Sequence, residues 1–310
     1  MKTIGILLPC YNERGNVRAI AEDIKKEFST NLVEYDYMIV FIDNDSTDGT
    51  QQILEQLCSE DSKIAAIFNT RNFNYYSSWY GIKNTPGDCV IQIPSDRQVP
   101  VSVIPQMIHE WESGSDFVCA IKNTSEENPI MWHMRQLFYK MSRLWMDIKE
   151  PLNNLVATLY DRTLLDAAIQ TNDSMMFKSL RVYMTSYCKN LSKVYVTQEV
   201  RKEGKSKNGF GDLIRIGMIR MTENSASIPF HLFILGLFVL FLSFVSSIAY
   251  VAMICNGILQ FDFGIPLILL FAFLFGYFII LCSLMANYIL KINDRVAHWP
   301  GVVEKKRINL

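Results

Sequence analysis

Residues 90–100, with the sequence VIQIPSDRQVP, place an acidic and an amide side chain directly after a predicted buried strand. The strand is a short, mostly β-branched apolar run, and Pro94 is expected to end its hydrogen-bond ladder. Asp96 and Gln98 then fall just outside the carboxyl end of the strand, where open α/β sheets bind ligands. Their oxygens suit Mg²⁺ or Mn²⁺ carrying phosphate groups, although a single loop carboxylate is more commonly only solvated.

A second acidic loop, DNDSTDGT, follows the apolar run at residues 37–42. Asp43, at the end of this predicted strand, can accept hydrogen bonds from a nucleobase N–H or a ribose hydroxyl. The same string is also common in loops, with Asp48 or Ser46 capping the next helix. It is not an EF-hand loop, because Leu54 stands where the closing glutamate would be.

The third candidate segment, RKEGKSK at residues 201–207, is basic. Arg201, Lys205 and Lys207 surround a glycine, and Ser206 adds a hydroxyl. Such a set could hold a diphosphate or a lipid phosphate. The alternative is a basic segment attracted to anionic lipid beside a membrane helix.

Strand-like and helix-like segments alternate along the chain that must position these loops. Strands are expected at residues 4–8, 37–42, 64–68, 90–93, 116–121, 155–160 and 193–200. Helices are expected at about 17–28, 51–59, 76–84, 101–113, 131–148, 162–171, 178–188 and 211–221. The alternation predicts a Rossmann-like α/β domain with a mostly parallel sheet, so that the loops after the first, second and fourth strands converge on one edge.

Two long apolar runs follow this domain. Residues 229–260 and 263–290 contain no Asp, Glu, Lys or Arg, and each run exceeds the roughly 20 residues that span a hydrocarbon core. We expect membrane helices at about 230–254 and 265–290, because two buried helices of a soluble protein would rarely be so long and so apolar. Basic residues flank the pair but are absent from the connecting segment, which predicts that both ends are cytoplasmic.

Composition agrees with a cytoplasmic domain attached to a membrane. The 310 residues are 50% hydrophobic, enough for a sizeable core and an apolar excess, and the net charge is −1. The seven cysteines form no CxxC pair and have no histidine partners at metal-binding spacing, which is typical of reduced thiols. The first nine residues contain a strand-like run that is too short for the apolar region of a signal peptide and is soon followed by the polar YNER.

Six segments occur together in one order: LLPCYNERGNV, FIDNDSTDGT, RNF, Asp96 with Gln98, RKEGKSK and the tail ANYILKINDRVAHWP. This order resembles the family 2 glycosyltransferases with a GT-A domain that act on polyprenyl phosphate. The resemblance includes bactoprenol glucosyltransferases and dolichol-phosphate mannosyltransferases, and it covers nearly the whole chain. It implies a GT-A domain at 1–210, a juxtamembrane helix at 211–228, a transmembrane hairpin at 229–291 and a cytoplasmic tail at 292–310.

The resemblance also implies roles for individual residues. Asp96 and Gln98 match the metal-binding end of the family's D-x-D-x-Q motif, and Arg201 and Lys207 match the cations near the phosphates. The positions implied to bind the nucleotide-sugar are Pro9, Tyr11, Asn12, Glu13, Asp43, Asp45, Arg71 and Ser206.

Three positions depart from the family pattern. Pro94 and Val99 replace acids of the D-x-D-x-Q segment, and Val156 stands where the family carries its candidate catalytic base, unless a gap brings Asn153 or Asn154 there. Losing a general base typically costs about 10²- to 10⁴-fold in rate. A lipid phosphate is already ionised near neutral pH, however, and hardly needs a base.

The resemblance implies an inverting transfer of sugar from a nucleotide-sugar, expected to be UDP-linked, to polyprenyl (undecaprenyl) phosphate at the cytoplasmic face of a bacterial inner membrane. It also implies a homo-oligomer, with a tetramer among the options, and no nucleic-acid partner. The alternative is a weakly active or inactive relative that binds nucleotide or lipid phosphate or scaffolds a partner. A processive polysaccharide synthase is disfavoured, because no Q-x-x-R-W segment is present.

Overall fold

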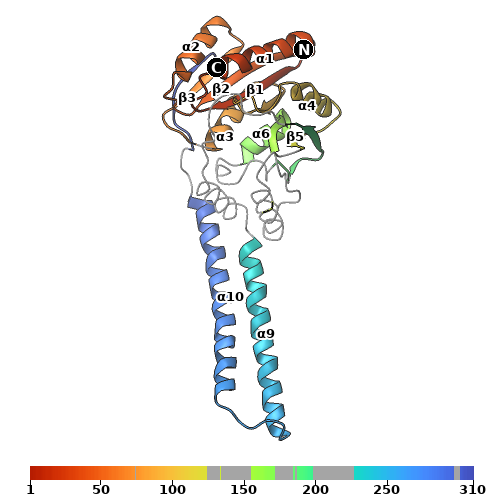
Figure 1. Cartoon of the computed structure of the whole chain (residues 1–310), viewed down its shortest axis with the longest axis vertical. Helices are drawn as coiled ribbons and strands as arrows, with labels where there is room; N and C mark the ends of the chain where they lie inside the picture. Colours follow the sequence, from red (N-terminus) through yellow and green to blue (C-terminus); the bar gives the residue numbers. More distant parts are fainter. Residues whose placement is uncertain are drawn as a thin grey trace. The chain divides into compact units, whose positions relative to one another are not determined.

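A computed structural model describes residues 1–73, 75–123, 133, 155–171, 184–185, 187–197, 227–296 and 301–310 (Figure 1). The chain divides into two compact units. One unit contains the amino-terminal α/β domain together with the last ten residues, and the other contains two long helices. The helices expected at 131–148 and 211–221 lie outside the described residues, as does most of the helix expected at 178–188.

The described part of the α/β unit is built on one eight-stranded sheet with the order β7-β5-β6-β4-β1-β2-β3-β8. Its strands are β1 (Thr3–Cys10), β2 (Asp36–Asp43), β3 (Ile64–Asn69), β4 (Cys89–Gln92), β5 (Phe117–Lys122), β6 (Leu155–Asp161), β7 (Leu191–Val196) and β8 (Glu304–Ile308). Strands β4, β1, β2 and β3 run parallel, as predicted, whereas β6 is antiparallel to both of its neighbours. Strand β8 was not expected, since the sequence predicts only a tail there.

Proline does not end the first strand. Strand β1 continues to Cys10, and Pro9 lies opposite Ile42 of β2. The missing N–H is tolerated because β4 pairs with β1 only as far as Leu7. Other predicted elements are shifted at their ends by one to four residues, as expected for ends placed from sequence.

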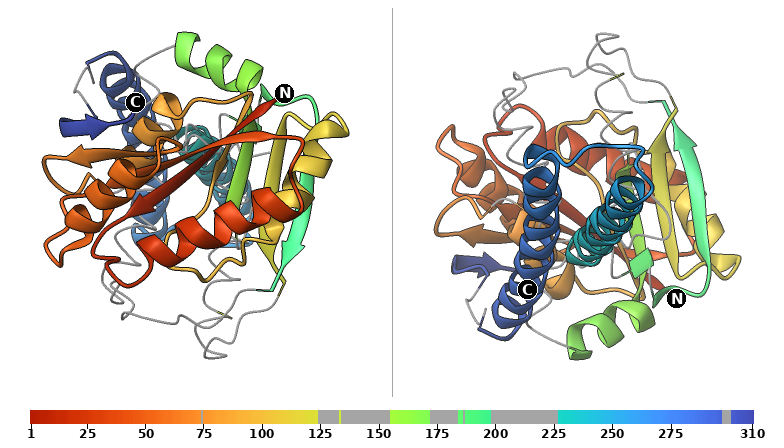
Figure 2. Two further views of the ribbon diagram at one scale, coloured as in Figure 1. Left: turned by 90° about the horizontal axis from the view of Figure 1, so that it is seen from above. Right: turned by 90° about the horizontal axis from the view of Figure 1, so that it is seen from below.

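Helices cover both faces of the sheet (Figure 2). They are α1 (Val17–Thr30), α2 (Thr50–Glu60), α3 (Tyr75–Asn84), α4 (Val103–Glu112) and α6 (Arg162–Thr171). Buried residues of α1, α2 and α4 pack with Ile6 and Leu8 of β1 on one face, and buried residues of α3 and α6 share the opposite cluster with Leu7. This alternation along β1 is the two-residue period of a strand buried on both faces.

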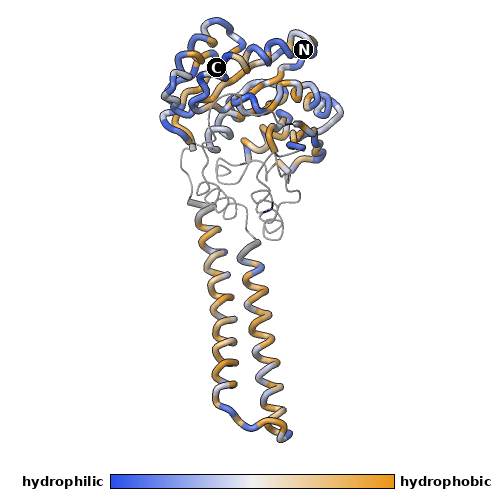
Figure 3. The backbone as a smooth tube through the Cα atoms, in the orientation of Figure 1, coloured by the Kyte–Doolittle hydropathy of each residue, from blue (hydrophilic) through white to orange (hydrophobic). Residues whose placement is uncertain are grey.

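The second unit consists of helices α9 (Ser227–Cys255) and α10 (Gly264–Val296). Their segments Pro229–Cys255 and Gly264–Leu290 are long and apolar enough to cross a membrane, which indicates membrane association (Figure 3). The predicted hairpin is therefore present, with ends within a few residues of those expected.

Small residues spaced seven apart form the contact between these two helices. Gly236 and Ser243 are buried on α9, and Gly276 and Ser283 are buried on α10. A Cβ added to Gly236 would lie 3.0 Å from the carbonyl oxygen of Gly276, so the two backbones touch at this point. A seven-residue period of small side chains is typical of close helix packing in membranes.

Candidate active site

The loops that follow β1, β2 and β4 are hydrogen bonded to one another at the carboxyl edge of the sheet. The amide of Asn12 donates to the hydroxyl of Ser46 at 2.8 Å, and the amide of Thr47 donates to the side-chain oxygen of Asn12 at 2.8 Å. The hydroxyl of Ser95 donates to the carbonyl of Pro9, also at 2.8 Å. The convergence predicted from the order of strands is confirmed.

Each of these loops contains one non-glycine residue in the left-handed backbone region. The φ angles are 55° at Asn12, 63° at Asp45 and 58° at Arg97, and the described residues contain only one other such position, Asn309. This conformation costs on the order of 1 kcal/mol for most residues and is concentrated at functional sites. The three loops are therefore strained where they meet.

Asp43 is fully buried and bonded within its own loop. One carboxylate oxygen accepts the hydroxyl of Ser46 at 2.5 Å, and the other accepts the amide of Ser46 at 3.0 Å and the side chain of Gln51 at 2.7 Å. Burial raises the pKa of the neighbouring Cys10 thiol well above its ordinary value, and the charge of Asp43 raises it further. A direct bond from Asp43 to a nucleotide stays a prediction, and it requires one of these donors to move away.

Asp45 and Asp48 differ in the hydrogen bonds that their carboxylates accept from the protein. Burial alone would raise the pKa of Asp48, but hydrogen bonds from the hydroxyl and amide of Thr50 and from the amide of Arg14 leave it below its ordinary value. The half-buried Asp45 has no hydrogen bond or ion pair with any residue that the structure describes. Asp45 is therefore the acid of this loop that is best placed to meet a ligand.

Asp96 is half-buried and lies in the loop after β4, as predicted. One of its oxygens accepts the amide of Gln98 at 3.1 Å, and its other oxygen and the Gln98 side chain have no partner within the described ranges. Within the described residues, no group of three or more His, Cys, Asp or Glu side chains is placed to hold a metal ion. One carboxylate and one amide nevertheless fit a Mg²⁺ or Mn²⁺ ion whose remaining ligands are phosphate oxygens and water.

Arg97 fixes this loop to helix α1. Its guanidinium lies 2.7 Å from the carboxylate of Asp23. A groove of about 290 Å³ lies between α1 and residues 97–101. Val99 is 1% exposed and belongs to the hydrophobic core. The acid expected there from the family pattern would be buried among apolar side chains.

Pro94 lies just after β4, and Val156 lies near the start of β6. The last residue of β4, Gln92, lies opposite Thr158 of β6. Val156 packs against the core. Neither position therefore supplies a carboxylate in this chain; Asn153 and Asn154 lie outside the described residues.

The remaining predicted residues fall into three groups. Glu13 accepts the side chain of Asn16 at 2.7 Å and is mostly buried, so it orders the first loop, where Tyr11 is half-buried. Arg71 is exposed in the loop after β3, with its guanidinium 4.8 Å from the ring centre of Phe73. Three predicted residues lie outside the described ranges: Arg201, Ser206 and Lys207.

The sequence prediction missed Ser95 and Gln51, which hold the loops in place. The hydrogen bond of Ser95 reaches Pro9, which is distant in sequence. The hydrogen bond of Gln51 crosses the loop between β2 and α2 to reach Asp43. The only available signal was a polar side chain beside each acidic motif. Such a side chain is common at helix starts and strand ends without any role at a site.

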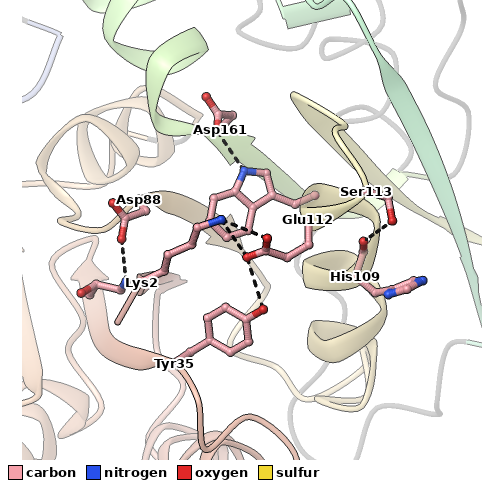
Figure 4. Close-up of polar contacts among 9 residues, drawn as sticks. Lys2, Tyr35, Asp88, His109, Glu112, Ser113 and Asp161 are labelled. Atoms are coloured by element: carbon pink, nitrogen blue, oxygen red, sulfur yellow. Dashed lines mark hydrogen bonds and ion pairs between the residues drawn. The ribbon is translucent and has the colours of Figure 1, made fainter.

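A separate polar cluster lies at the opposite, amino-terminal edge of the sheet (Figure 4). Lys2 lies 2.9 Å from Glu112 and 4.6 Å from the ring centre of Trp111, whose indole N–H donates to Asp161 at 2.8 Å. Burial raises the pKa of Tyr35, and the charge of Glu112 adds to this effect. Because these groups bind one another, we interpret the cluster as a structural contact that connects α4 with the start of β1 and the end of β6.

A twisted sheet whose central strands are parallel, with polar loops gathered at their carboxyl ends, is of the type that binds nucleotides. Residues 5–206 match the protein family described as "Glycosyl transferase family 2". The chain belongs to this family, and its α/β domain is a family 2 glycosyltransferase domain. The family predicted from the sequence is confirmed.

Several relatives extend this comparison. CsbB of Bacillus subtilis (strain 168), which has a glycosyltransferase name, is 29% identical over 260 residues, or 82% of this chain and 77% of the relative. An undecaprenyl-phosphate 4-deoxy-4-formamido-L-arabinose transferase of Pseudomonas fluorescens (strain Pf0-1) is 25% identical over 206 residues, or 66% and 59%. A bactoprenol glucosyl transferase of Shigella phage SfX is 32% identical over 140 residues, or 44% and 45%. The chain thus spans less than two thirds of the last two relatives.

Among solved structures, glucosyl-3-phosphoglycerate synthase from Mycobacterium tuberculosis in complex with uridine diphosphate has a TM-score of 0.46 and 16% identity. The match covers 72% of this chain and 78% of the synthase. Another structure of the same synthase contains Mn²⁺, UDP-glucose and glycerol 3-phosphate and has a TM-score of 0.43.

Proposed function

We propose that the protein is an inverting glycosyltransferase that moves a sugar from a nucleotide-sugar, preferably a UDP-sugar, to polyprenyl (undecaprenyl) phosphate. One observation carries the proposal: a family 2 domain and two helices of membrane length occur in a single chain. An acceptor that is itself embedded in the bilayer explains why the enzyme needs such helices. Two relatives are named for undecaprenyl phosphate and for bactoprenol, which supports this acceptor class.

In the proposed reaction, an oxygen of the lipid phosphate attacks the anomeric carbon opposite the leaving group. A carbon–oxygen bond to the lipid phosphate forms as the bond to the nucleoside diphosphate breaks, so the configuration inverts. The attacking oxygen is already ionised, and the apolar Val156 is therefore compatible with the reaction. Positioning of the two substrates, worth about 7–11 kcal/mol in well-oriented systems, supplies much of the rate.

The chain's own residues have distinct tasks in this reaction. The loops containing Asn12 and Asp45 would bind the nucleoside, and Arg71 and the predicted cations Arg201 and Lys207 would bind phosphate oxygens. Asp96 and Gln98 would hold Mg²⁺ or Mn²⁺, which when bound neutralises charge on the departing diphosphate. These roles extend the sequence prediction. Asp45 is preferred to Asp43 as a nucleotide ligand, because the carboxylate of Asp43 already accepts hydrogen bonds from Ser46 and Gln51.

The chain order supports a multi-pass arrangement with the catalytic domain in the cytoplasm. Residues 301–310 follow both long helices and yet pair with β3 in the amino-terminal domain. Both ends of the hairpin must therefore be on the side of the membrane where this domain folds. The basic residues that flank the helices support the cytoplasm of a bacterial inner membrane as that side.

This arrangement predicts the labelling of native cysteines in intact cells. Cys255 is the last residue of α9, directly before the turn of the hairpin, and its exposed thiol should react with a membrane-impermeant maleimide from outside, after removal of any outer membrane. Cys188, in the catalytic unit, should react only after lysis. The C255S variant should lose the external label. Labelling of Cys188 before lysis, or of Cys255 only after it, would contradict the proposed orientation.

The function is tested by incubating the purified protein in detergent with undecaprenyl phosphate, Mn²⁺ and a panel of radiolabelled UDP- and GDP-sugars. Labelled lipid from one donor would support the proposal and identify the sugar. Nucleotide binding by calorimetry without transfer from any donor would favour the inactive, ligand-binding alternative. Mass measurement of the same detergent sample would test the expected homo-oligomer.

A further inference from the structure

The last strand of the chain completes the edge of the catalytic sheet. Strand β8 runs antiparallel to β3, with Lys306 opposite Phe68 and Glu304 opposite Asn69 (Figure 2). All six residues of β3 are buried, so without β8 a fully buried strand would lie at an open edge. The strand that protects this edge is therefore encoded after the membrane hairpin.

Side chains of the last ten residues fasten this strand on both faces of the sheet. Lys306 pairs with Glu55 of α2 and lies 4.8 Å from the ring centre of Phe68, while Arg307 reaches Asn84 of α3 at 3.5 Å. The side chain of Asn309, whose φ is 60°, donates to the carbonyls of Cys58 and Ile64, both at 2.8 Å. This set of contacts docks the segment in a specific register.

The same segment holds the loop that carries Arg71. The amide and the hydroxyl of Thr70 both donate to the carbonyl of Val303, each at 3.0 Å. On the other side of the loop, the amide of Phe73 lies 3.4 Å from the side-chain oxygen of Asn44, in the loop after β2. Residues 70–73 are thus held between the acidic loop and the carboxyl-terminal segment.

The buried side-chain amide of Asn69, directly before residues 70–73, makes this loop depend on its contacts with both Asn44 and Val303. Asn69 is fully buried and donates to Asn44 at 3.1 Å and to Ser77 at 2.8 Å, whereas its side-chain oxygen has no partner in the described part of the chain. A buried unpaired acceptor costs about 1–3 kcal/mol. The hydrogen bonds of Asn69 to the acidic loop therefore leave one buried acceptor unpaired. The two hydrogen bonds from Thr70 to Val303 add a second restraint on the loop.

We infer that residues 301–310 are a positioning element for the donor site, which hold Arg71 in place through Thr70 and so set the affinity for the nucleotide-sugar. The inference rests on the proposed function, because it assigns Arg71 to the donor. It extends that function, because the donor site becomes complete only when the segment beyond the membrane hairpin has docked.

The test uses the full protein and a variant that ends at residue 300 and keeps both membrane helices. UDP binding is measured by calorimetry, and hydrogen exchange is measured at residues 70–73. Truncation should weaken UDP binding at least tenfold and accelerate exchange at these amides. A synthetic peptide with the sequence of residues 301–310 should reverse both effects by adding the strand in trans, and a scrambled peptide of equal charge should not.

A milder variant covers the case in which the truncated protein fails to fold. Thr70→Val removes one hydroxyl and keeps the backbone bond, so it should raise the KM for the nucleotide-sugar several-fold and leave kcat nearly unchanged. Thr163→Val, at the exposed start of α6, is the matched control.

The outcomes separate this inference from the proposed function. Unchanged exchange at residues 70–73 after truncation would overturn the inference whatever the enzyme catalyses. Faster exchange with undiminished UDP binding would also overturn it, since the loop would then not serve the donor. Failure of the intact protein to bind any nucleotide would instead count against the proposed function, and the donor role of Arg71 would fall with it.

Discussion

Asp96→Asn should lower sugar transfer at least about 100-fold while leaving the fold intact, a loss comparable to removing one preorganised electrostatic contact from an active site. Asparagine keeps an oxygen that can accept the amide of Gln98, so the loop after β4 should retain its turn. What disappears is the negative charge that would hold a divalent cation beside the diphosphate.

The measurement for Asp96→Asn is kcat/KM for transfer from the preferred donor, repeated over a range of Mn²⁺ concentrations. Glu34→Gln is the matched control, because it removes an exposed carboxylate just before β2, on the opposite edge of the sheet. If the Asp96→Asn enzyme keeps its rate and its Mn²⁺ dependence, the metal site has been assigned to the wrong loop.

Gly5→Ala should destabilise the catalytic domain by about 3 kcal/mol, at the upper end of what overpacking usually costs. A Cβ on this residue of β1 would lie 2.2 Å from the carbonyl oxygen of Pro86 and 2.7 Å from the side-chain methyl of Thr85. The first neighbour is backbone in the turn that leads into β4, so it cannot rotate away. Either β1 or the turn must move, and β1 pairs with both β2 and β4.

Thermal or urea unfolding of the detergent-solubilised protein, followed by near-UV circular dichroism, measures this loss. Gly114→Ala is the control: its φ of 99° is strained for alanine, but an added Cβ there meets nothing within 4 Å. That variant should lose only on the order of 1 kcal/mol. A loss in Gly5→Ala no larger than that in Gly114→Ala would contradict the prediction, because the contact with Pro86 would then be relieved at little cost.

Patterns that repeat within one element were predictable from the sequence. The buried face of α1 follows from its apolar spacing, the hairpin follows from two uncharged runs, and Asp96 follows from its place after an apolar strand. In each case the signal lies within a few residues of the feature it predicts.

Features that depend on distant partners were not predictable. The sequence EKKRI of β8 has no apolar alternation, because its residues are exposed or half-buried and its pairing partner β3 ends more than two hundred residues earlier. The internal bonding of Asp43 depends on Ser46 and Gln51 side chains that have other common uses. The alternation of strands and helices correctly predicted that the acidic loops lie together. It could not show which of their carboxylates are hydrogen bonded within the protein.

The position of β8 after the membrane hairpin also orders the biosynthesis of the protein. Domains generally fold from the amino terminus as the chain leaves the ribosome, yet here the partner of β3 is translated only after both long helices. Until then, the growing polypeptide has an uncovered strand edge, a template for wrong pairing that a chaperone or rapid targeting to the insertion machinery would have to guard. The sheet reaches its final form only after both apolar helices have been translated, which links maturation of the catalytic domain to synthesis of its membrane anchor.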